Sequence, residues 1–527
     1  MTQLRARRKL TPTVISLSLA FAFVAGCGTT THGASTTSSG LGLEPSGTSG
    51  FTGSGANGGA GLGGAGSLGG AGGLAGDAGE AGASGGAQAS GGSATSSGSG
   101  QLGGGGPSAT SSLAVGGQSG SGPLVPPVFK IGVMDSSNAN AALSSLGSGT
   151  ANAQADAEAG TAMLDYVNKH GGIAGRPVAY DTNNVDATAS PELESQQACD
   201  QWTQDDHVTF AVPGSAVEDN DLLRTCLGQA GIPSLYGSIY SNTLDSSFAS
   251  SPLWFEYTTV SNNEYARTYV KGLASQGFFK SGKVGIVYYD QPPFSTTLNS
   301  TLLPDLKAAG VANPDIFGAD INGVSDLESG STQMSSAVLR FRADGVTKVL
   351  FFEPWVGYFV FMEVAREQGY TPTYGISSQE APEVVMSLGL LSPDELTGAH
   401  IVSWIPLGDV GNLTPYLGPL TATCTAIFKS YDVSIQPASD RLDFSVQYGG
   451  CEDLLLIQTA YEHAGRVLTA DDFVQGMQAM GTSVKLATRP AGSFSATKHY
   501  GISEFWNGHF DSGCGCFVYD GGPQPLP

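Results

Sequence analysis

Residues 129–181 constrain the fold of this chain more than any other stretch. The run Phe-Lys-Ile-Gly-Val-Met at 129–134 is short and apolar, which predicts a strand. Residues 152–168 repeat apolar side chains at helical spacing and stop before a Gly-Gly pair, a common helix end. A second strand is predicted at 177–181. Such a strand–helix–strand unit has a right-handed crossover and builds a parallel sheet.

The same stretch carries a family resemblance. Its wording Asn-Lys-His-Gly-Gly-Ile-Ala-Gly-Arg-Pro-Val, followed by a strand that ends in Asp181, resembles the start of type I periplasmic binding proteins. The nearest branch is the leucine/isoleucine/valine-binding family of ABC-transporter substrate-binding proteins. This resemblance implies an α/β fold of two doubly wound parallel-sheet lobes, joined by a hinge of several crossings, with the ligand in the cleft between them.

The N-terminus has the pattern of a lipoprotein leader. Cations within the first nine residues precede an apolar core at 14–24 that is too short for a stable membrane span. The core ends in Val-Ala-Gly-Cys, which resembles an actinobacterial-type lipoprotein box with Cys27 as the acylated residue. We therefore expect a signal peptide at 1–26 and a lipid anchor on the outer face of the cell membrane. An ordinary signal peptide with a stray cysteine is the alternative.

The remaining chain divides by composition and by predicted crossings. Residues 27–127 are rich in Gly and Ser without apolar periodicity, which predicts a disordered linker. The predicted folded units are lobe 1 at 128–257 with a returning segment at about 405–480, lobe 2 at 258–404, and a C-terminal segment at 481–527. The aromatic run at 253–258 is predicted as the first crossing, and strands near 500–506 and 516–519 as the last.

Charge and motif content exclude several classes of function. The formal charge is −23, and no basic cluster occurs outside the leader, which excludes nucleic-acid binding through phosphates. No later stretch has 18 uninterrupted apolar residues, so no second membrane span is expected. The seven histidines are dispersed, and the predicted folded part holds no H-E-x-x-H and no nucleophile elbow. We expect no enzyme activity, no cofactor and no metal site.

The cysteines predict disulfide bonds. Seven are present, and six remain if Cys27 carries lipid. An even number in an exported chain favours disulfides, although six cysteines allow 15 pairings. Cys199 and Cys226 lie on successive predicted helices, and in a sheet of order 2-1-3-4-5 these helices share one face. We therefore favour the pair Cys199–Cys226 above the others.

The other four cysteines are assigned less directly. Cys424 and Cys451 also lie on successive predicted helices, which favours their pairing. Cys514 and Cys516 are separated by one glycine and would close a very small ring. Such a bond would be strained, and two free thiols are an equal alternative.

Ligands of parallel sheets lie beyond the carboxyl ends of the strands, so the loops there predict the binding site. The predicted ligand-binding residues are Ser136, Gly214, Ser215, Ala216, Ser238 and Tyr240 in the first lobe, and Tyr289, Asp290, Glu353, Trp355, Ser378 and Glu380 in the second. Residues 214–216 precede a predicted helix, so their N–H groups and the Ser215 hydroxyl favour a ligand carboxylate. The resemblance implies the same role, and a simple helix cap is the alternative.

An amino-acid ligand also needs an anion for its ammonium group. Glu353 is the first choice, followed by Asp290 and Glu380. The aromatic residues expected to pack the rest of the ligand are Tyr240, Tyr289 and Trp355. The loop Glu-Pro-Trp at 353–355 departs from the small or polar loop expected of aliphatic amino-acid binders, so an aromatic acid, a polar amino acid or an amide is equally open.

The resemblance implies a solute-binding protein of an ABC importer that closes around a small ligand and presents it to a membrane permease. We expect reversible binding by a monomer, without turnover. A ligand-binding component of a sensory system, with the same fold, is the first alternative. A cell-surface hydrolase is the second, and the motif content disfavours it.

Overall fold

The computed structural model describes residues 127–135, 152–184, 191–214, 220–237, 240–321, 327–353, 355–465, 468–490 and 492–527. All of these belong to one compact unit of the chain. The predicted signal peptide, Cys27 and nearly all of the predicted linker lie outside the described residues. Within the described ranges, every helix is too short or too polar to cross a membrane.

The first sheet is parallel and has the strand order β2-β1-β3-β4-β5, which confirms the predicted order 2-1-3-4-5. Its strands are β1 (Phe129–Asp135), β2 (Val178–Asn184), β3 (Phe210–Val212), β4 (Ser234–Tyr236) and β5 (Trp254–Glu256). The assignment of 253–258 to the first crossing was wrong, because β5 pairs with β4 at the edge of this sheet. Its side chains are all buried, so they extend the core.

Side chains of β1 alternate between two cores. Ile131 and Val133 belong to the larger core cluster, whereas Met134 belongs to a smaller one that contains Trp202. Gly132 also faces Trp202, and a Cβ at Gly132 would stand 2.7 Å from the indole. The glycine therefore lets the indole lie directly against the strand, and the strand is buried on both faces, as parallel strands are.

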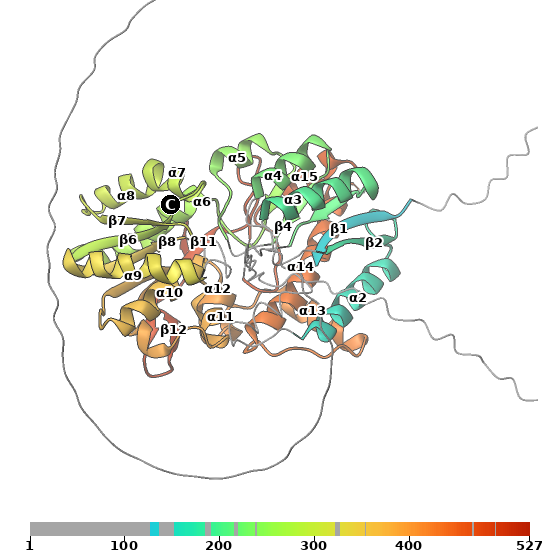
Figure 1. The fold of residues 1–527 in the computed structure, drawn as a ribbon. Coiled ribbons are helices and arrows are strands. Elements are labelled where there is room, and N and C mark those ends of the chain that lie inside the picture. Colours follow the sequence, from blue (N-terminus) through green and yellow to red (C-terminus); the bar gives the residue numbers. More distant parts are fainter. Residues whose placement is uncertain are drawn as a thin grey trace, which may run out of the picture. The chain divides into compact units, whose positions relative to one another are not determined.

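Helices cover both faces of the first sheet (Figure 1). They are α2 (Ala153–Lys169), α3 (Pro191–Asp200, continued by a π-helical turn Gln201–Asp205), α4 (Asn220–Gln229), α5 (Asp245–Ser250), α13 (Leu420–Ser430), α14 (Arg441–His463) and α15 (Ala470–Met480). Helices α3 and α4 pack on each other over the smaller core. Helices α2, α14 and α15 supply side chains to the larger core, so chain segments far apart in sequence complete this half.

The second sheet is mixed rather than wholly parallel. Its order is β12-β11-β10-β9-β8-β6-β7, and β13 pairs with β11. Its strands are β6 (Lys283–Tyr289), β7 (Asp315–Ala319), β8 (Val346–Phe352), β9 (Thr373–Ser377), β10 (His400–Ser403), β11 (Glu504–Asp511), β12 (Cys516–Tyr519) and β13 (Gln524–Pro525). The C-terminal strands, predicted as part of the last crossing, extend this sheet in antiparallel fashion. A tight turn joins β11 to β12, and such a turn can only connect antiparallel strands.

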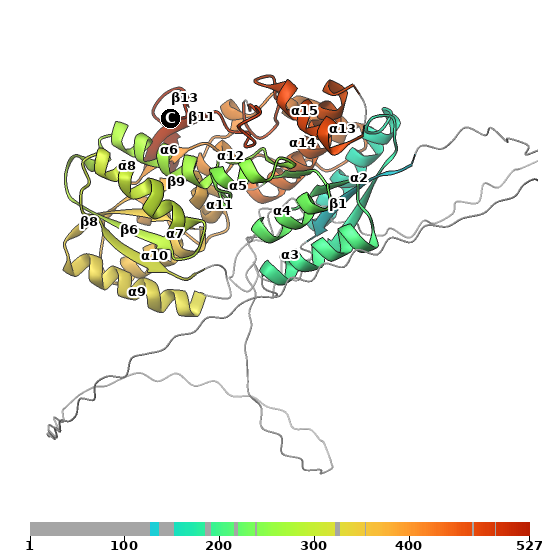
Figure 2. The same cartoon turned by 90° about the horizontal axis from the view of Figure 1, so that it is seen from above.

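Helices also sandwich the second sheet. They are α6 (Asn262–Ser275), α7 (Phe294–Thr297), α8 (Leu303–Ala308), α9 (Leu327–Ala343), α10 (Trp355–Glu367), α11 (Pro382–Ser387) and α12 (Pro406–Asp409). Figure 1 shows α6, α7 and α8 above this sheet and α9 and α10 below it, and Figure 2 shows the same arrangement from above. The fold is thus α/β with a parallel sheet, a mixed sheet and helices on both faces of each.

The described chain passes between the two sheets at 257–261, at 404–419 and in the region 481–503. Buried polar contacts hold these crossings together. Arg489 Nη1 donates to Thr258 O at 2.6 Å, which joins the third crossing to the first. Glu452 of α14 accepts from Thr488 N at 2.6 Å. These contacts hold the crossings to one another and to α14.

Three disulfides are present among the described residues, and they are the predicted pairs. Cys199–Cys226 joins α3 to α4 with a Cα–Cα distance of 6.1 Å. Cys424–Cys451 joins α13 to α14 at 6.0 Å, and Cys514–Cys516 closes the turn between β11 and β12 at 5.2 Å. The alternative of two free thiols at Cys514 and Cys516 is therefore not what the structure shows.

Candidate functional site

The predicted ligand-binding residues of the first lobe are only partly described. Ser136, Ser215, Ala216 and Ser238 lie outside the described residues. Gly214 follows β3 and is buried, and Tyr240, in the loop after β4, is 1% exposed. The predicted carboxylate grip at 214–216 therefore stays a prediction.

Glu353 is a buried carboxylate at the carboxyl end of β8. Its side chain is 1% exposed, and its Oε1 has no hydrogen-bond partner within the described residues. Burial raises the pKa of this carboxyl well above its ordinary value, and the nearby charge of Glu380 raises it further. The carboxyl lies over the first turn of α10, where Gly357 leaves room for it. A buried oxygen without a partner is costly to fold and is typical of functional sites.

Glu380, after β9, is held by its own helical turn. Its Oε2 accepts hydrogen bonds from Ser377 N and Ser377 Oγ, both at 2.6 Å, in a capping box. Its Oε1 lies 3.4 Å from the Tyr265 hydroxyl, which donates to Phe351 O at 3.0 Å. Burial raises the pKa of Glu380 to about 8, although the bonds from Ser377 oppose the shift. Glu380 thus braces the strand end and places a second carboxyl beside Glu353.

Ser378, another predicted residue, has its hydrogen-bonding capacity used inside the protein. Its Oγ donates to Asp409 Oδ2 and accepts from Trp404 N at 2.7 Å and from Ile405 N at 3.0 Å. Asp409 Oδ2 also accepts from Ser403 Oγ at 2.5 Å. A serine hydroxyl has one donor and two acceptor positions, so Ser378 has none left for a ligand. Burial raises the pKa of Asp409 to about 7.

Buried polar atoms without a hydrogen-bond partner gather at the carboxyl ends of β8, β9 and β10. Within the described residues these atoms are Glu353 Oε1, Tyr358 Oη, Gln379 Nε2, Trp404 Nε1 and Asp409 Oδ1. Tyr358 lies close enough to Glu380 and Asp409 for their charges to raise the pKa of its hydroxyl, in addition to the effect of burial. The ring of Trp404 lies 5.4 Å from that of Tyr265, whose hydroxyl is 3.4 Å from Glu380 Oε1. The set contains acceptors and donors, which suits a ligand with a positive and a negative group.

Loops after β4 and β9 connect the two sheets at this site. Ser241 N donates to Gln379 Oε1 at 2.9 Å. Ser241 O accepts from Asn262 Nδ2 at 2.6 Å, and Ser241 Oγ shares a hydrogen bond with Thr259 Oγ1 at 2.7 Å. All of these residues are buried. Asp409 and Ser241 were not predicted, because a single polar residue in a loop carries no motif. Gln379 lies between the predicted Ser378 and Glu380 but was not singled out.

Tyr289 is the last residue of β6 and Asp290 follows it, so both lie farther along the edge of the second sheet. Asp290 is exposed, and its carboxylate accepts from the Tyr288 hydroxyl at 2.6 Å. The Tyr289 ring is 5.9 Å from that of Phe294, which in turn lies 5.5 Å from the ring of Phe352. Tyr289 therefore packs on the aromatic cluster that leads to Glu353, whereas Asp290 faces solvent. Trp355 is the first residue of α10.

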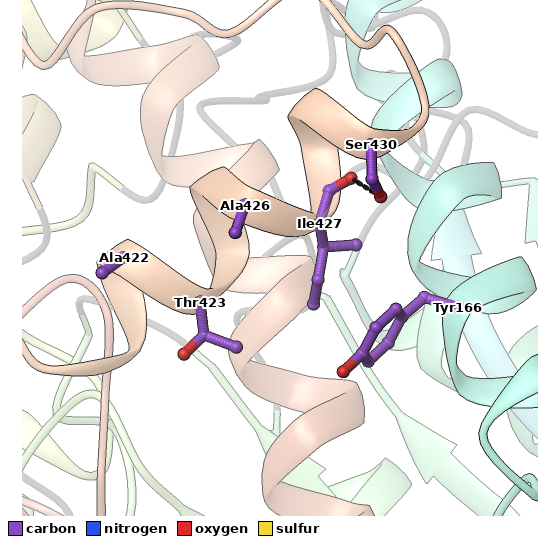
Figure 3. Close-up of a pocket in the computed structure, with 6 residues that line it drawn as sticks. All are labelled: Tyr166, Ala422, Thr423, Ala426, Ile427 and Ser430. Carbon is purple, nitrogen blue, oxygen red and sulfur yellow. Dashed lines mark hydrogen bonds between the residues drawn. The ribbon is translucent and has the colours of Figure 1, made fainter.

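Two hollows lie away from this site. Figure 3 shows an open one of about 440 Å³ between α2 and α13, lined by Tyr166 and by Ala422, Thr423, Ala426, Ile427 and Ser430. A smaller one of about 10 Å³ lies between the first sheet and Asp453 of α14. It has the size of a single water molecule. Neither contains a residue predicted to bind ligand, and the described residues contain no group of His, Cys, Asp and Glu placed to hold a metal ion.

Solved structures resemble this chain. A solute-binding protein of an ABC transporter from R. palustris, in complex with 4-hydroxybenzoate, has a TM-score of 0.55 at 13% identity and covers 76% of this chain and 98% of its own. An extracellular ligand-binding receptor from Verminephrobacter eiseniae has a TM-score of 0.53 at 17% identity, and the match covers 75% of this chain and 100% of the receptor. A possible leucine/isoleucine/valine-binding protein from Rhodopirellula baltica has 0.50 at 13%, covering 76% and 98%. These likenesses show a shared fold.

Sequence comparison gives the family. None of the curated proteins matches this chain by sequence. The model of the family described as periplasmic binding protein matches residues 141–513, which is more than half of the chain. That family and the similar structures are binding proteins rather than enzymes. The chain belongs to the periplasmic binding protein family.

Proposed function

We propose that this protein is the lipid-anchored extracytoplasmic solute-binding protein of an ABC importer. It binds a small amino acid-like or carboxylate ligand between the two sheets, as a monomer, and delivers it to a membrane permease. Family membership supports binding without turnover. The leader sequence supports export and acylation of Cys27.

The observation that carries the proposal is the buried Glu353 Oε1, which has no hydrogen-bond partner among the described residues. A lone buried carboxyl does not stabilise the fold, because the protein would be more stable with an apolar residue of similar size at this position. A ligand that supplies a donor to this oxygen repays that cost only when bound. Closure of the two sheets then follows from the higher affinity of the ligand for the closed state.

The ligand's chemistry follows from the groups around Glu353. An ammonium group would hold the carboxyl ionised, and the amides predicted at 214–216 would take the ligand carboxylate. A hydroxybenzoate, such as the ligand of the R. palustris protein, offers a carboxylate and a phenol but no cation. Both classes, and amides, carry groups complementary to the buried donors and acceptors near Glu353.

A thermal-shift screen of the protein without its leader tests the function. We expect a specific amino acid, amide or aromatic acid to raise the melting temperature. At a ligand concentration of 100 times its Kd, the free energy of unfolding should rise by about 2.7 kcal/mol. Glu353→Gln should abolish the shift for ligands with an ammonium group while the protein stays folded. Chemical change of a ligand during incubation, measured by mass spectrometry, would contradict a pure binding function.

A further inference from the structure

The turn between β11 and β12 carries a disulfide within three residues. Cys514 and Cys516 are bonded, and Gly515 between them has φ +64°. Gly515 N donates to Asp511 O at 2.9 Å, so the turn is also closed by its backbone. Stabilisation by a disulfide grows with the length of the loop that it closes. A ring this short adds little to a hairpin that strand pairing already holds, so a purely structural role explains it poorly.

The three disulfides differ in their access to solvent. Cys514 is exposed and Cys516 half-buried. Cys199 and Cys226 are both half-buried, whereas Cys424 and Cys451 are each 0% exposed. Thiol–disulfide exchange requires an attacking sulfur to reach a disulfide sulfur. We therefore expect Cys514–Cys516, which has the most exposed sulfur, to exchange faster than the other two disulfides.

The two sulfurs of the turn also differ. Cys516 lies against the backbone of Gly411, where an added Cβ would stand 2.6 Å from its Sγ. Gly411 N donates to Phe517 O at 3.1 Å, and Arg441 Nη2 holds the Gly411 carbonyl at 2.8 Å. This segment therefore covers Cys516 from one side, and Cys514 is the sulfur that an incoming reagent reaches.

We propose that Cys514–Cys516 is a thiol–disulfide exchange site whose substrate is an exogenous thiol. A thiolate attacks Cys514 Sγ, the bond between the two cysteines breaks, and Cys516 leaves as a thiolate that takes a proton from solvent. A second thiolate then attacks the external sulfur of the mixed disulfide and releases Cys514. Overall, two thiols are oxidised to one disulfide as the protein disulfide is reduced to two thiols.

Graded reduction of the folded wild-type protein tests the site. The protein is incubated with dithiothreitol, quenched with N-ethylmaleimide at set times, and mapped by peptide mass spectrometry, with circular dichroism to follow folding. We expect Cys514 and Cys516 to be labelled about tenfold or more faster than Cys199 and Cys226. Reduction of all bonds together, or of Cys514–Cys516 only after unfolding, would overturn the proposal.

Single-cysteine variants test which sulfur is attacked. Cys516→Ser leaves the exposed Cys514 thiol, and Cys514→Ser leaves the thiol that Gly411 covers. Both variants are treated with 5,5′-dithiobis(2-nitrobenzoate), and we expect Cys514 to react several-fold faster. Equal rates, or a faster Cys516, would contradict the assigned direction. The wild-type experiment decides the proposal even if a variant fails to fold.

Discussion

Replacing Gly357 by alanine tests the position of Glu353 directly. Gly357 lies in the first turns of α10, and a Cβ there would stand 2.0 Å from Glu353 Oε2 and 2.4 Å from its Cδ. Non-bonded heavy atoms lie about 3.5–4.0 Å apart at their best separation. The substitution therefore forces the carboxyl out of its place, or the helix away from β8.

Two opposing terms set the size of the effect. Glycine to alanine within a helix normally stabilises a protein by about 0.8–1 kcal/mol. Overpacking a filled core costs about 1–3 kcal/mol. We expect Gly357→Ala to lower the free energy of unfolding of the wild type by up to about 2 kcal/mol. In a Glu353→Ala background the clash is absent, so the same change should stabilise, and the cycle should show a coupling of about 1–3 kcal/mol.

Urea unfolding of the four proteins without ligand, followed by circular dichroism, measures this coupling. Gly228→Ala in α4 is the matched control, because no atom of the described residues lies within 4 Å of a Cβ added there. The control should stabilise by up to about 1 kcal/mol in either background. The reasoning is refuted if Gly357→Ala behaves like Gly228→Ala, or if the coupling with Glu353 is near zero.

Two further predictions concern stability. Burial raises the pKa of Glu380 to about 8 and that of Asp409 to about 7, so the folded state holds protons that the unfolded state has lost above pH 4–5. These bound protons contribute fully to the stability of the folded state below the unfolded pKa values, and their contribution disappears as pH rises through about 7–8. The free energy of unfolding without ligand should therefore fall between pH 5 and 8. If Glu380→Gln left this pH dependence unchanged, the prediction would be contradicted. The bond Cys424–Cys451 has a sequence separation of 27, and loop entropy predicts that it stabilises the folded protein by about 3.6 kcal/mol. The double variant Cys424→Ala, Cys451→Ala should lose most of this stabilisation in urea unfolding. A loss below about 1 kcal/mol would contradict the prediction.

The sequence predicted those parts of the fold that depend on local periodicity and on strand order. The bond Cys199–Cys226 was predicted because order 2-1-3-4-5 places two crossover helices on one face. The strand β5 was mistaken for a crossing, since an extended aromatic run looks the same in an edge strand and in a linker. The edge strand β7 was not predicted, because its five residues include an aspartate and a glycine and lack a continuous apolar run. Hydrogen-bond partners, not composition, distinguish these cases.

The candidate site shows a similar limit. Sequence position suggested that Glu353 and Glu380 follow two successive strands. In the structure these strands pair, and the two carboxyls lie near enough for one charge to raise the pKa of the other. The sequence did not show that the Ser378 hydroxyl donates to Asp409, or that Gln379 accepts a hydrogen bond from Ser241 in the loop after β4. The first contact joins residues 31 positions apart and the second joins residues 138 positions apart, so both arise only when the sheets are assembled.

Proton release on ligand binding tests the central claim most directly. An ammonium ligand at Glu353 should ionise a carboxyl whose pKa burial has raised, so binding should release a proton and affinity should increase with pH by up to about tenfold per unit. Isothermal titration calorimetry in buffers of different ionisation enthalpy measures this proton, with Glu353→Gln as the comparison. We expect the wild type to release a proton on binding, and Glu353→Gln to lose this release together with most of the affinity. Unchanged affinity and proton balance in Glu353→Gln would contradict it.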